Sequence, residues 1–194
     1  LRDLMPDPSS LKDMDKAASR IADAIEAGEK LAIFGDYDVD GATSTALLKR
    51  FFRALGADAP VHIPDRMKEG YGPNAPALLE LQRNGANLIL TVDCGVTAYA
   101  PLQEAKDAGI EIIVVDHHAC DVVPLRGLNR AFVTQGIKVM RHRSNVGMTA
   151  LADIAGVNET PSAYHLGFVL GPRVNAGGRV GESFLGTTLL SGEN

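Results

Sequence analysis

The stretch "KLAIFGDYDVDGATS" (residues 30–44) decides the fold, because it joins an apolar run directly to a group of acids. Residues 31–34 are continuously apolar, which is typical of a strand that is covered on both faces of a sheet. A glycine and three aspartates then follow within six residues. The same pattern returns in "NLILTVD" (87–93) and "IEIIVVD" (110–116). The sequence therefore predicts parallel strands that each end in an acid.

Helical patterns separate these strands and predict an α/β fold. Amphipathic or helix-rich segments cover residues 11–27, 41–55, 74–85 and 98–109, and a further short strand is expected at 61–64. Strands that alternate with helices indicate a mostly parallel sheet with helices on both faces. The C-terminal third lacks strand patterns, and we expect helices at 129–140, 146–156 and 162–171.

The composition is that of a soluble globular domain. The chain has 194 residues, of which 45% are hydrophobic and 22% charged. No apolar run approaches the length of a membrane span, and residues 1–10 do not form a signal peptide. Because the sequence begins with leucine, we expect residues of the full protein to precede it. Cys94 and Cys120 form no metal-binding pair, so we expect a reduced, cytoplasmic protein.

The charge is divided unevenly along the chain. The net charge of −5 argues against a general nucleic-acid binder, but residues 1–118 carry 12 Lys and Arg against 19 Asp and Glu, and residues 119–181 carry seven against three. Acids thus gather with the strand ends, and basic residues gather after them. This asymmetry suits a metal site beside a phosphate-binding surface, and chance surface charge explains it equally well.

The acids at the strand ends predict a metal centre. The carboxyl ends of parallel strands meet in one crevice, so we expect Asp36, Asp38, Asp40, Asp93 and Asp116 to converge with His117 and His118. Clustered carboxylates repel one another, and divalent cations relieve that repulsion. This ligand set suits two Mn²⁺ or Mg²⁺ ions and the hydrolysis of a phosphodiester. The alternative is that each aspartate only caps a helix or ends a turn.

Three of these motifs resemble those of a known family. "DYDVDGATS", "TVDCG" and "VVDHH" are similar, in this order, to motifs of the DHH phosphoesterases. "IPDRMKEGYG" (63–72), "DVVPL" (121–125) and "LGPRVNAGGRVG" (170–181) narrow the resemblance to the RecJ group of single-strand-specific 5′→3′ exonucleases.

This resemblance implies roles for particular residues. The implied metal ligands are Asp36, Asp38, Asp40, Asp93, His117 and Asp121, with Asp93 bridging two ions. The implied catalytic group consists of Asp93, His117, His118 and Asp116, of which Asp116 would orient an imidazole. Arg66, Arg173, Arg179, Asn175 and Tyr71 are the implied contacts to DNA.

The sequence departs from the family pattern in two places. Only Ala119 and Cys120 separate the DHH triplet from Asp121, where RecJ proteins carry several tens of residues, so we expect a missing segment at 119–120. We expect residues 1–183 to form the DHH catalytic domain and 184–194 to start a linker helix. We expect this stretch of sequence to lack the DHHA1-type and OB-fold domains that RecJ proteins carry.

Three functions are compatible with these motifs. The first is a RecJ-like exonuclease that acts as a monomer on single-stranded DNA with a 5′ end, beside a helicase or a single-strand-binding protein and away from membranes. The second is another DHH hydrolase that cleaves short oligonucleotides, cyclic dinucleotides or pyrophosphate. The third is a non-catalytic scaffold that retains the fold, which the complete set of motif acids disfavours.

Overall fold

A four-stranded parallel sheet forms the centre of the computed structural model, which describes residues 7–117, 127–177 and 182–192. Its strands are β1 (Leu31–Phe34), β2 (Val61–His62), β3 (Leu88–Val92) and β4 (Glu111–Val115), in the order β2-β1-β3-β4. Every pair is parallel, with Ile33 opposite both Val61 and Leu90. The predicted strands and their parallel arrangement are confirmed.

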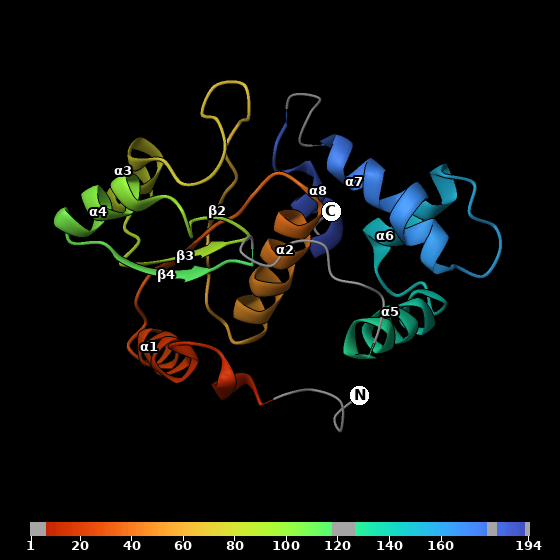
Figure 1. The fold of residues 1–194 in the computed structure, drawn as a ribbon, viewed down its shortest axis with the longest axis horizontal. Helices are drawn as coiled ribbons and strands as arrows, with labels where there is room; N and C mark the ends of the chain where they lie inside the picture. The colour runs from red at the N-terminus through yellow and green to blue at the C-terminus, as the bar shows by residue number, and fades with distance from the viewer. Residues whose placement is uncertain (1–6, 118–126, 178–181, 193–194) are drawn as a thin grey trace.

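Helices cover both faces of this sheet (Figure 1). The four helices are α1 (Met14–Glu26), α2 (Val39–Ala54), α3 (Ala75–Arg83) and α4 (Tyr99–Asp107). Ala32, Phe34 and Ile89 point to one face and share a core with residues of α3 and α4. The alternate residues Leu31 and Ile33 pack with residues of α1 and α2 on the other face. The middle strands are therefore buried on both sides, as continuous apolar runs require.

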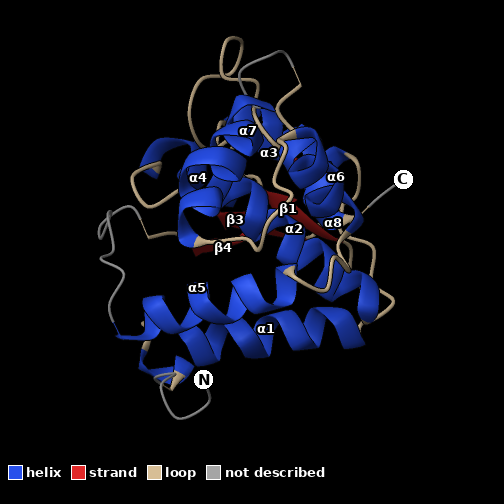
Figure 2. Cartoon of the chain, turned by 90° about the vertical axis from the view of Figure 1, so that its right-hand side faces the viewer, coloured by secondary structure: helices blue, strands red, loops and turns tan. Residues whose placement is uncertain are grey.

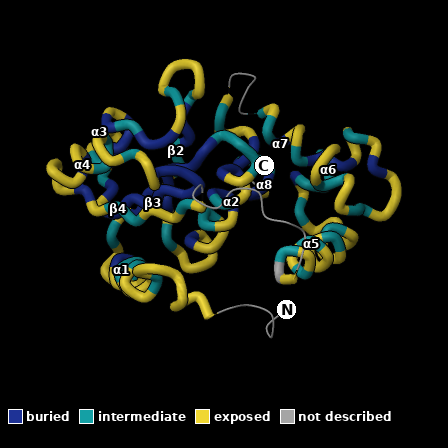
Figure 3. Tube along the Cα trace, viewed as in Figure 1, coloured by how far each residue is buried: buried dark blue, intermediate teal, exposed yellow. Residues whose placement is uncertain are grey.

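The helices do not fully cover β4, which is one of the two edge strands of the sheet. Strands β1 and β3 are wholly buried, whereas Val114 is 40% exposed and Val115 is 52% exposed. These two side chains point to opposite faces of the sheet. The prediction of helices on both faces is confirmed, and the carboxyl end of this edge strand is the part of the sheet that they leave exposed. Figure 3 shows the same contrast between the buried centre and the exposed rim.

The C-terminal third is helical, as predicted. It contains α5 (Gly127–Met140), α6 (Val146–Ile154), the π-helix η4 (His165–Leu170), α7 (Gly171–Gly177) and α8 (Leu185–Ser191). These helices lie on the α2 side of the molecule, far from α3 and α4 (Figure 1). In the view of Figure 2, helices surround the small central sheet. None of the helices in the described ranges is both long and apolar enough to cross a membrane.

Helix α8 packs directly on α2. Leu190 of α8 and Val174 of α7 share a small core with Ala42 and Ala46 of α2. Gly186 lies so close that an added Cβ would come within 3.1 Å of Ala42 and of Val174. Residues 185–191 are therefore part of the packed domain, and their expected role as the start of a linker stays a prediction.

The close approach of α2 to the end of β1 gives a first testable prediction. A Cβ on Gly41 would lie 2.5–2.7 Å from backbone atoms of Asp36. Because backbone cannot move aside cheaply, we expect Gly41→Ala to lower the free energy of unfolding by about 1–3 kcal/mol. Urea denaturation of the variant and the parent protein measures this difference.

Gly136 provides the matched control, since it lies inside α5 and an added Cβ would meet nothing within 4 Å. Gly136→Ala should raise stability by up to about 1 kcal/mol, because alanine favours a helix over glycine. Equal effects of the two substitutions would contradict the proposed contact between Gly41 and Asp36.

Candidate metal centre

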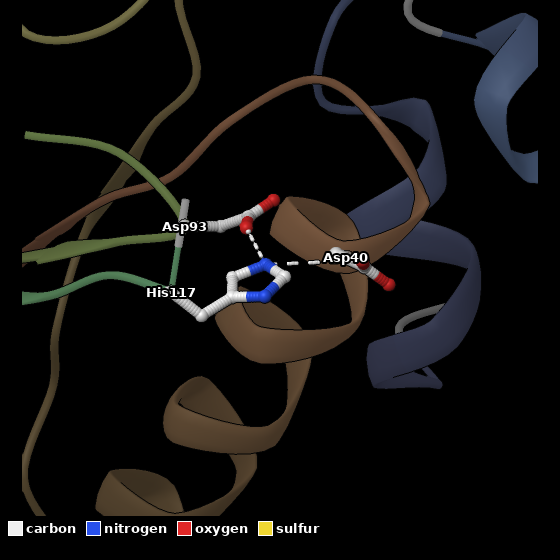
Figure 4. A group of neighbouring side chains, drawn as sticks. All are labelled: Asp40, Asp93 and His117. Atoms are coloured by element: carbon white, nitrogen blue, oxygen red, sulfur yellow. Dashed lines mark hydrogen bonds and ion pairs between the residues drawn. The ribbon is translucent and has the colours of Figure 1, made fainter. Parts of the chain in front are cut away.

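Four of the acids predicted to meet at the strand ends lie close together there, namely Asp36, Asp38, Asp40 and Asp93, while Asp116 belongs to neither of their two ligand groups. Asp36 follows β1 after one glycine, and Asp38 and Asp40 stand at the start of α2. Asp93 follows β3, and His117 follows β4. In Figure 4 the side chains of Asp93, His117 and Asp40 point toward one another, although they come from three separate segments. The parallel sheet brings them together because all of its strands end at the same edge.

These side chains form two groups of ligands that share Asp93. Oxygens of Asp36, Asp38 and Asp93 lie within 4.8 Å of one another. Asp40, Asp93 and His117 form the second group within the same limit. Two cations held by one shared carboxylate are the arrangement that clamps both sides of a phosphoryl group. The predicted bridging position of Asp93 is consistent with this geometry.

Asp93 is the most constrained of these residues. Its side chain is 2% exposed, and its backbone has the positive φ of 61°, which is strained for a residue other than glycine. Nε2 of His117 and Oδ1 of Asp93 share a hydrogen bond of 2.6 Å. Oδ2 is buried and has no hydrogen-bond partner within the described residues. Burial, and next the charge of Asp38, raise the pKa of Asp93 to about 7.

These properties fit a divalent cation. A buried carboxylate oxygen without a donor is costly, and a cation at this point would satisfy it. A cation would also remove the repulsion between Asp38 and Asp93 that raises the pKa. Carboxylates with one imidazole are the ligands that Mn²⁺ or Mg²⁺ accepts. The donor set therefore fits the ions that the sequence predicts.

Two of the acids also have structural roles. Asp38 caps α2, because its Oδ1 accepts from the amides of Asp40 at 2.9 Å and Gly41 at 3.1 Å. Asp116 accepts from the amide of Val96 at 2.9 Å, which connects the end of β4 to the loop after β3. The cap interpretation is thus correct for Asp38, but the same carboxylate also belongs to a ligand group. The expected role of Asp116 in orienting an imidazole stays a prediction.

Two of the predicted DNA contacts lie beside this centre. The hydroxyl of Tyr71 donates to the carbonyl oxygen of Asp93 at 3.5 Å. The guanidinium of Arg66 lies 5.4 Å from the centre of the Tyr37 ring. Tyr37 also meets Tyr71 edge to face, with ring centres 6.5 Å apart. The sequence analysis missed Tyr37, and its position between Asp36 and Asp38 is the signal that could have found it.

The other residues predicted to contact DNA do not lie beside the acids in the part of the chain that the structure describes. Arg173 lies on α7, where its Nη1 donates to the carbonyl of Val169 at 2.7 Å. Asn175 lies two residues further along the same helix, and no contact between described residues joins either side chain to the acids. His118, Asp121 and Arg179 lie outside the described residues, as does the expected missing segment at 119–120.

An open parallel sheet whose strand ends gather carboxylates and an imidazole defines a class of protein, the α/β proteins with a candidate divalent-cation site at the carboxyl edge of the sheet. The family follows from the sequence. The model of the DHH family, N-terminal domain, matches residues 30–150. This match covers more than half of the chain, which therefore belongs to the DHH family.

The chain is also similar to curated RecJ proteins. It is 31% identical to the single-stranded-DNA-specific exonuclease RecJ of Bacillus subtilis, over 97% of the chain and 31% of that protein. The RecJ of Thermus thermophilus is 32% identical, over 93% of the chain and 35% of its own length. The chain thus spans about a third of the length of these relatives.

Solved structures give the same result. A crystal structure of exonuclease RecJ bound to manganese superposes with a TM-score of 0.83 at 31% identity, covering 97% of this chain and 62% of that one. RecJ from Thermus thermophilus in complex with Mn²⁺ superposes with a TM-score of 0.81 at 29% identity, covering 98% and 36% of the two chains. The α/β fold and its helical C-terminal part are those of RecJ structures.

The raised pKa of Asp93 predicts how stability depends on pH. The folded protein holds a proton on Asp93 between its ordinary pKa of 3.8 and about 7, so it binds more protons than the unfolded chain in this window. The free energy of unfolding should therefore fall as pH rises from 4 to 7, by on the order of 2–4 kcal/mol. Thermal melts without metal at several pH values measure this fall.

Asp93→Asn removes the titrating group and keeps a residue that tolerates positive φ. Its unfolding free energy should lose this part of the pH dependence. Asp107→Asn, at the end of α4 and away from the ligand groups, should retain it. An unchanged slope in Asp93→Asn would mean that Asp93 is charged throughout this pH range.

Proposed function

We propose that this chain is the catalytic core of a metal-dependent phosphodiesterase that degrades single-stranded DNA from its 5′ end, as a RecJ-like exonuclease. The observation that carries this proposal is the sharing of Asp93 between two ligand groups. The similarity to single-stranded-DNA-specific exonucleases supports the choice of substrate. The proposed direction of degradation, from the 5′ end, rests on the resemblance of the motifs to the RecJ group.

Mn²⁺ or Mg²⁺ is the proposed cofactor. Asp36, Asp38 and Asp93 would hold one ion, and Asp40, Asp93 and His117 the other, with Asp121 as a further ligand. Bound divalent ions polarise phosphoryl oxygens and lower the pKa of water. Solved RecJ structures with Mn²⁺ and with Mg²⁺ support both choices of ion.

The side chains of this chain position the substrate and the ligands. The contact of 2.6 Å between His117 and Asp93 fixes both side chains against each other. Asp116 would hold the histidines in place through the end of β4, with His118 beside the scissile phosphate. Arg66 binds a phosphate in this proposal, because a guanidinium offers two parallel donors to phosphate oxygens. Tyr71 stacks on a base, and Arg173, Arg179 and Asn175 contact the strand further away.

The proposal also covers the partners of the protein, its oligomeric state and its location in the cell. The partners are single-stranded DNA and, within the cell, a helicase or a single-strand-binding protein. We propose a monomer that works in the cytoplasm. The alternative activity on short oligonucleotides, cyclic dinucleotides or pyrophosphate uses the same acids, and a non-catalytic scaffold would have no use for them.

Residues 1–183 form the catalytic domain in this proposal, with a segment missing between Ala119 and Cys120. The alignment with the Bacillus subtilis relative runs over 249 residues, although the chain has only 194. Extra residues of the relative therefore lie inside the matched stretch. The exposed Val114 and Val115 end β4 just before the proposed seam, so an inserted segment would start beside uncovered apolar surface.

Inserting the corresponding Bacillus subtilis segment between Ala119 and Cys120 should raise the melting temperature, because it would cover these valines. Calorimetry of the chimera and the parent chain measures the change. An insertion of equal length made of glycine and serine is the control and should not raise stability. A chimera no more stable than this control would argue against the seam.

Hydrolysis of 5′-phosphorylated single-stranded DNA tests the proposed activity. We expect cleavage with Mn²⁺ and none after chelation. Asp93→Asn and Asp40→Asn should each lower the rate at least about a hundredfold, since each removes a ligand charge from the site. Asp107→Asn should leave the rate unchanged. Gel electrophoresis of DNA labelled at the 3′ end follows the reaction.

The choice of substrate separates the alternatives. Faster hydrolysis of dinucleotides or pyrophosphate than of long single strands would favour the second DHH activity. If the protein neither binds Mn²⁺ by calorimetry nor cleaves any of these substrates, the proposal is contradicted. The non-catalytic scaffold is then the remaining function. Cleavage that persists without metal would contradict the assigned role of the acids.

A further inference from the structure

A chain of contacts connects the 64–72 loop to the metal centre. Asp65 accepts from the amides of Met67 at 2.9 Å and Lys68 at 3.3 Å, which fixes the turn that carries Arg66. Glu69 accepts from the amide of Asp65 at 2.8 Å and contacts His62 of β2 at 2.9 Å. The loop is thus attached to the sheet at its base, and Arg66 stands on an ordered turn.

Arg66 rests on an aromatic ring although acids are close by. Its guanidinium lies 5.4 Å from the centre of the Tyr37 ring. Tyr37 stands between Asp36 and Asp38, which belong to one of the two ligand groups. Within the described residues no carboxylate forms an ion pair with Arg66. The ring face stabilises the guanidinium of Arg66 without an ion pair to one of the candidate metal ligands.

The position over the ring leaves the donors of Arg66 available, since no carboxylate among the described residues forms an ion pair with them. The five N–H groups of a guanidinium lie in the plane of its fork, so its contact with a ring does not have to use all of them. A guanidinium held in this way can still bind two phosphate oxygens at once. Tyr37 is itself held from the side by Tyr71, whose hydroxyl donates to the carbonyl of Asp93. The orientation of Arg66 is thus tied to the backbone beside the shared ligand.

We propose that Tyr37 is a positioning residue that holds Arg66 ready for the terminal phosphate of a nucleic-acid strand. This inference rests on the proposed function, since it names how the same site would recognise a phosphorylated end. Tyr37 acts through Arg66 and does not itself touch the phosphate. Removing the ring should weaken binding of phosphorylated ends specifically, and removing only its hydroxyl should not.

The test compares the affinities of 5′-phosphorylated and 5′-hydroxyl oligonucleotides of the same sequence. Fluorescence anisotropy with a 3′ label measures them, with Ca²⁺ in place of Mn²⁺ and the DNA checked for integrity. Tyr37→Leu should lower the preference for the phosphorylated end about threefold to fivefold, the size of an exposed cation–π contact. Arg66→Gln should lower it about tenfold or more, and Tyr37→Phe should retain it.

Two further variants make the result specific. If Tyr37 acts through Arg66, the double variant Tyr37→Leu with Arg66→Gln should resemble Arg66→Gln alone. Tyr99→Leu is the matched control, because Tyr99 is 79% exposed on α4 and away from the site. It should leave the preference unchanged.

Three outcomes would overturn the inference. The parent protein could bind phosphorylated and hydroxyl ends equally well, or Tyr37→Leu could lower the affinity for both ends by the same factor. The third outcome is a double variant whose loss of preference equals the sum of the two single losses in free energy. The binding assay does not depend on cleavage. A preference with these variant effects but without hydrolysis would therefore contradict the proposed function and leave this inference standing.

Discussion

The burial of Asp93 among other carboxylates is the constraint on which the rest of the site depends. Its side chain is almost inaccessible, and one oxygen has no donor among the described residues. A carboxylate in this position is unfavourable unless a proton or a cation neutralises it. The strained backbone at Asp93 shows that the fold holds the carboxylate there against its local preference. Such strain is typical of functional positions rather than of turns chosen for stability.

Helix α2 holds the other half of the centre at the correct distance. Gly41 allows the first turn of the helix to touch the backbone of Asp36, where any side chain would collide. The Asp38 cap then fixes the start of the same helix, and Asp40 follows within its first turn. Three acids close in sequence are thereby spread over both ligand groups. The glycine is needed for this close approach, and not for an unusual φ.

The sequence could predict the part of the site that follows from strand ends. Parallel strands finish at one edge, so Asp93, His117 and the acids after β1 had to meet whatever the loops did. The contact between Tyr37 and Arg66 could not be predicted in this way. It depends on the fold of the 64–72 loop, which places Arg66 over the Tyr37 ring, and no periodic pattern records this. The left-handed backbone of Asp93 was equally hidden, because aspartate does not require it.

The same limit applies to the C-terminal helices. Their helical state was readable from composition and periodicity, but their partners were not, since many apolar stripes can pack on one another. The structure selects α2 as the partner of α6, α7 and α8, whereas α5 and η4 pack on α6. Val174 is buried against α2 between Arg173 and Asn175, and Leu190 of α8 lies in the same core. The helix that begins with the candidate metal ligands is thus also the support for the segment "GPRVNAG". Arg173 and Asn175 do not reach the acids, yet their distance from the metal centre is fixed through this one rigid element. Any substrate strand that contacts both regions must therefore span a separation set by the packing of α2, and not by the loops.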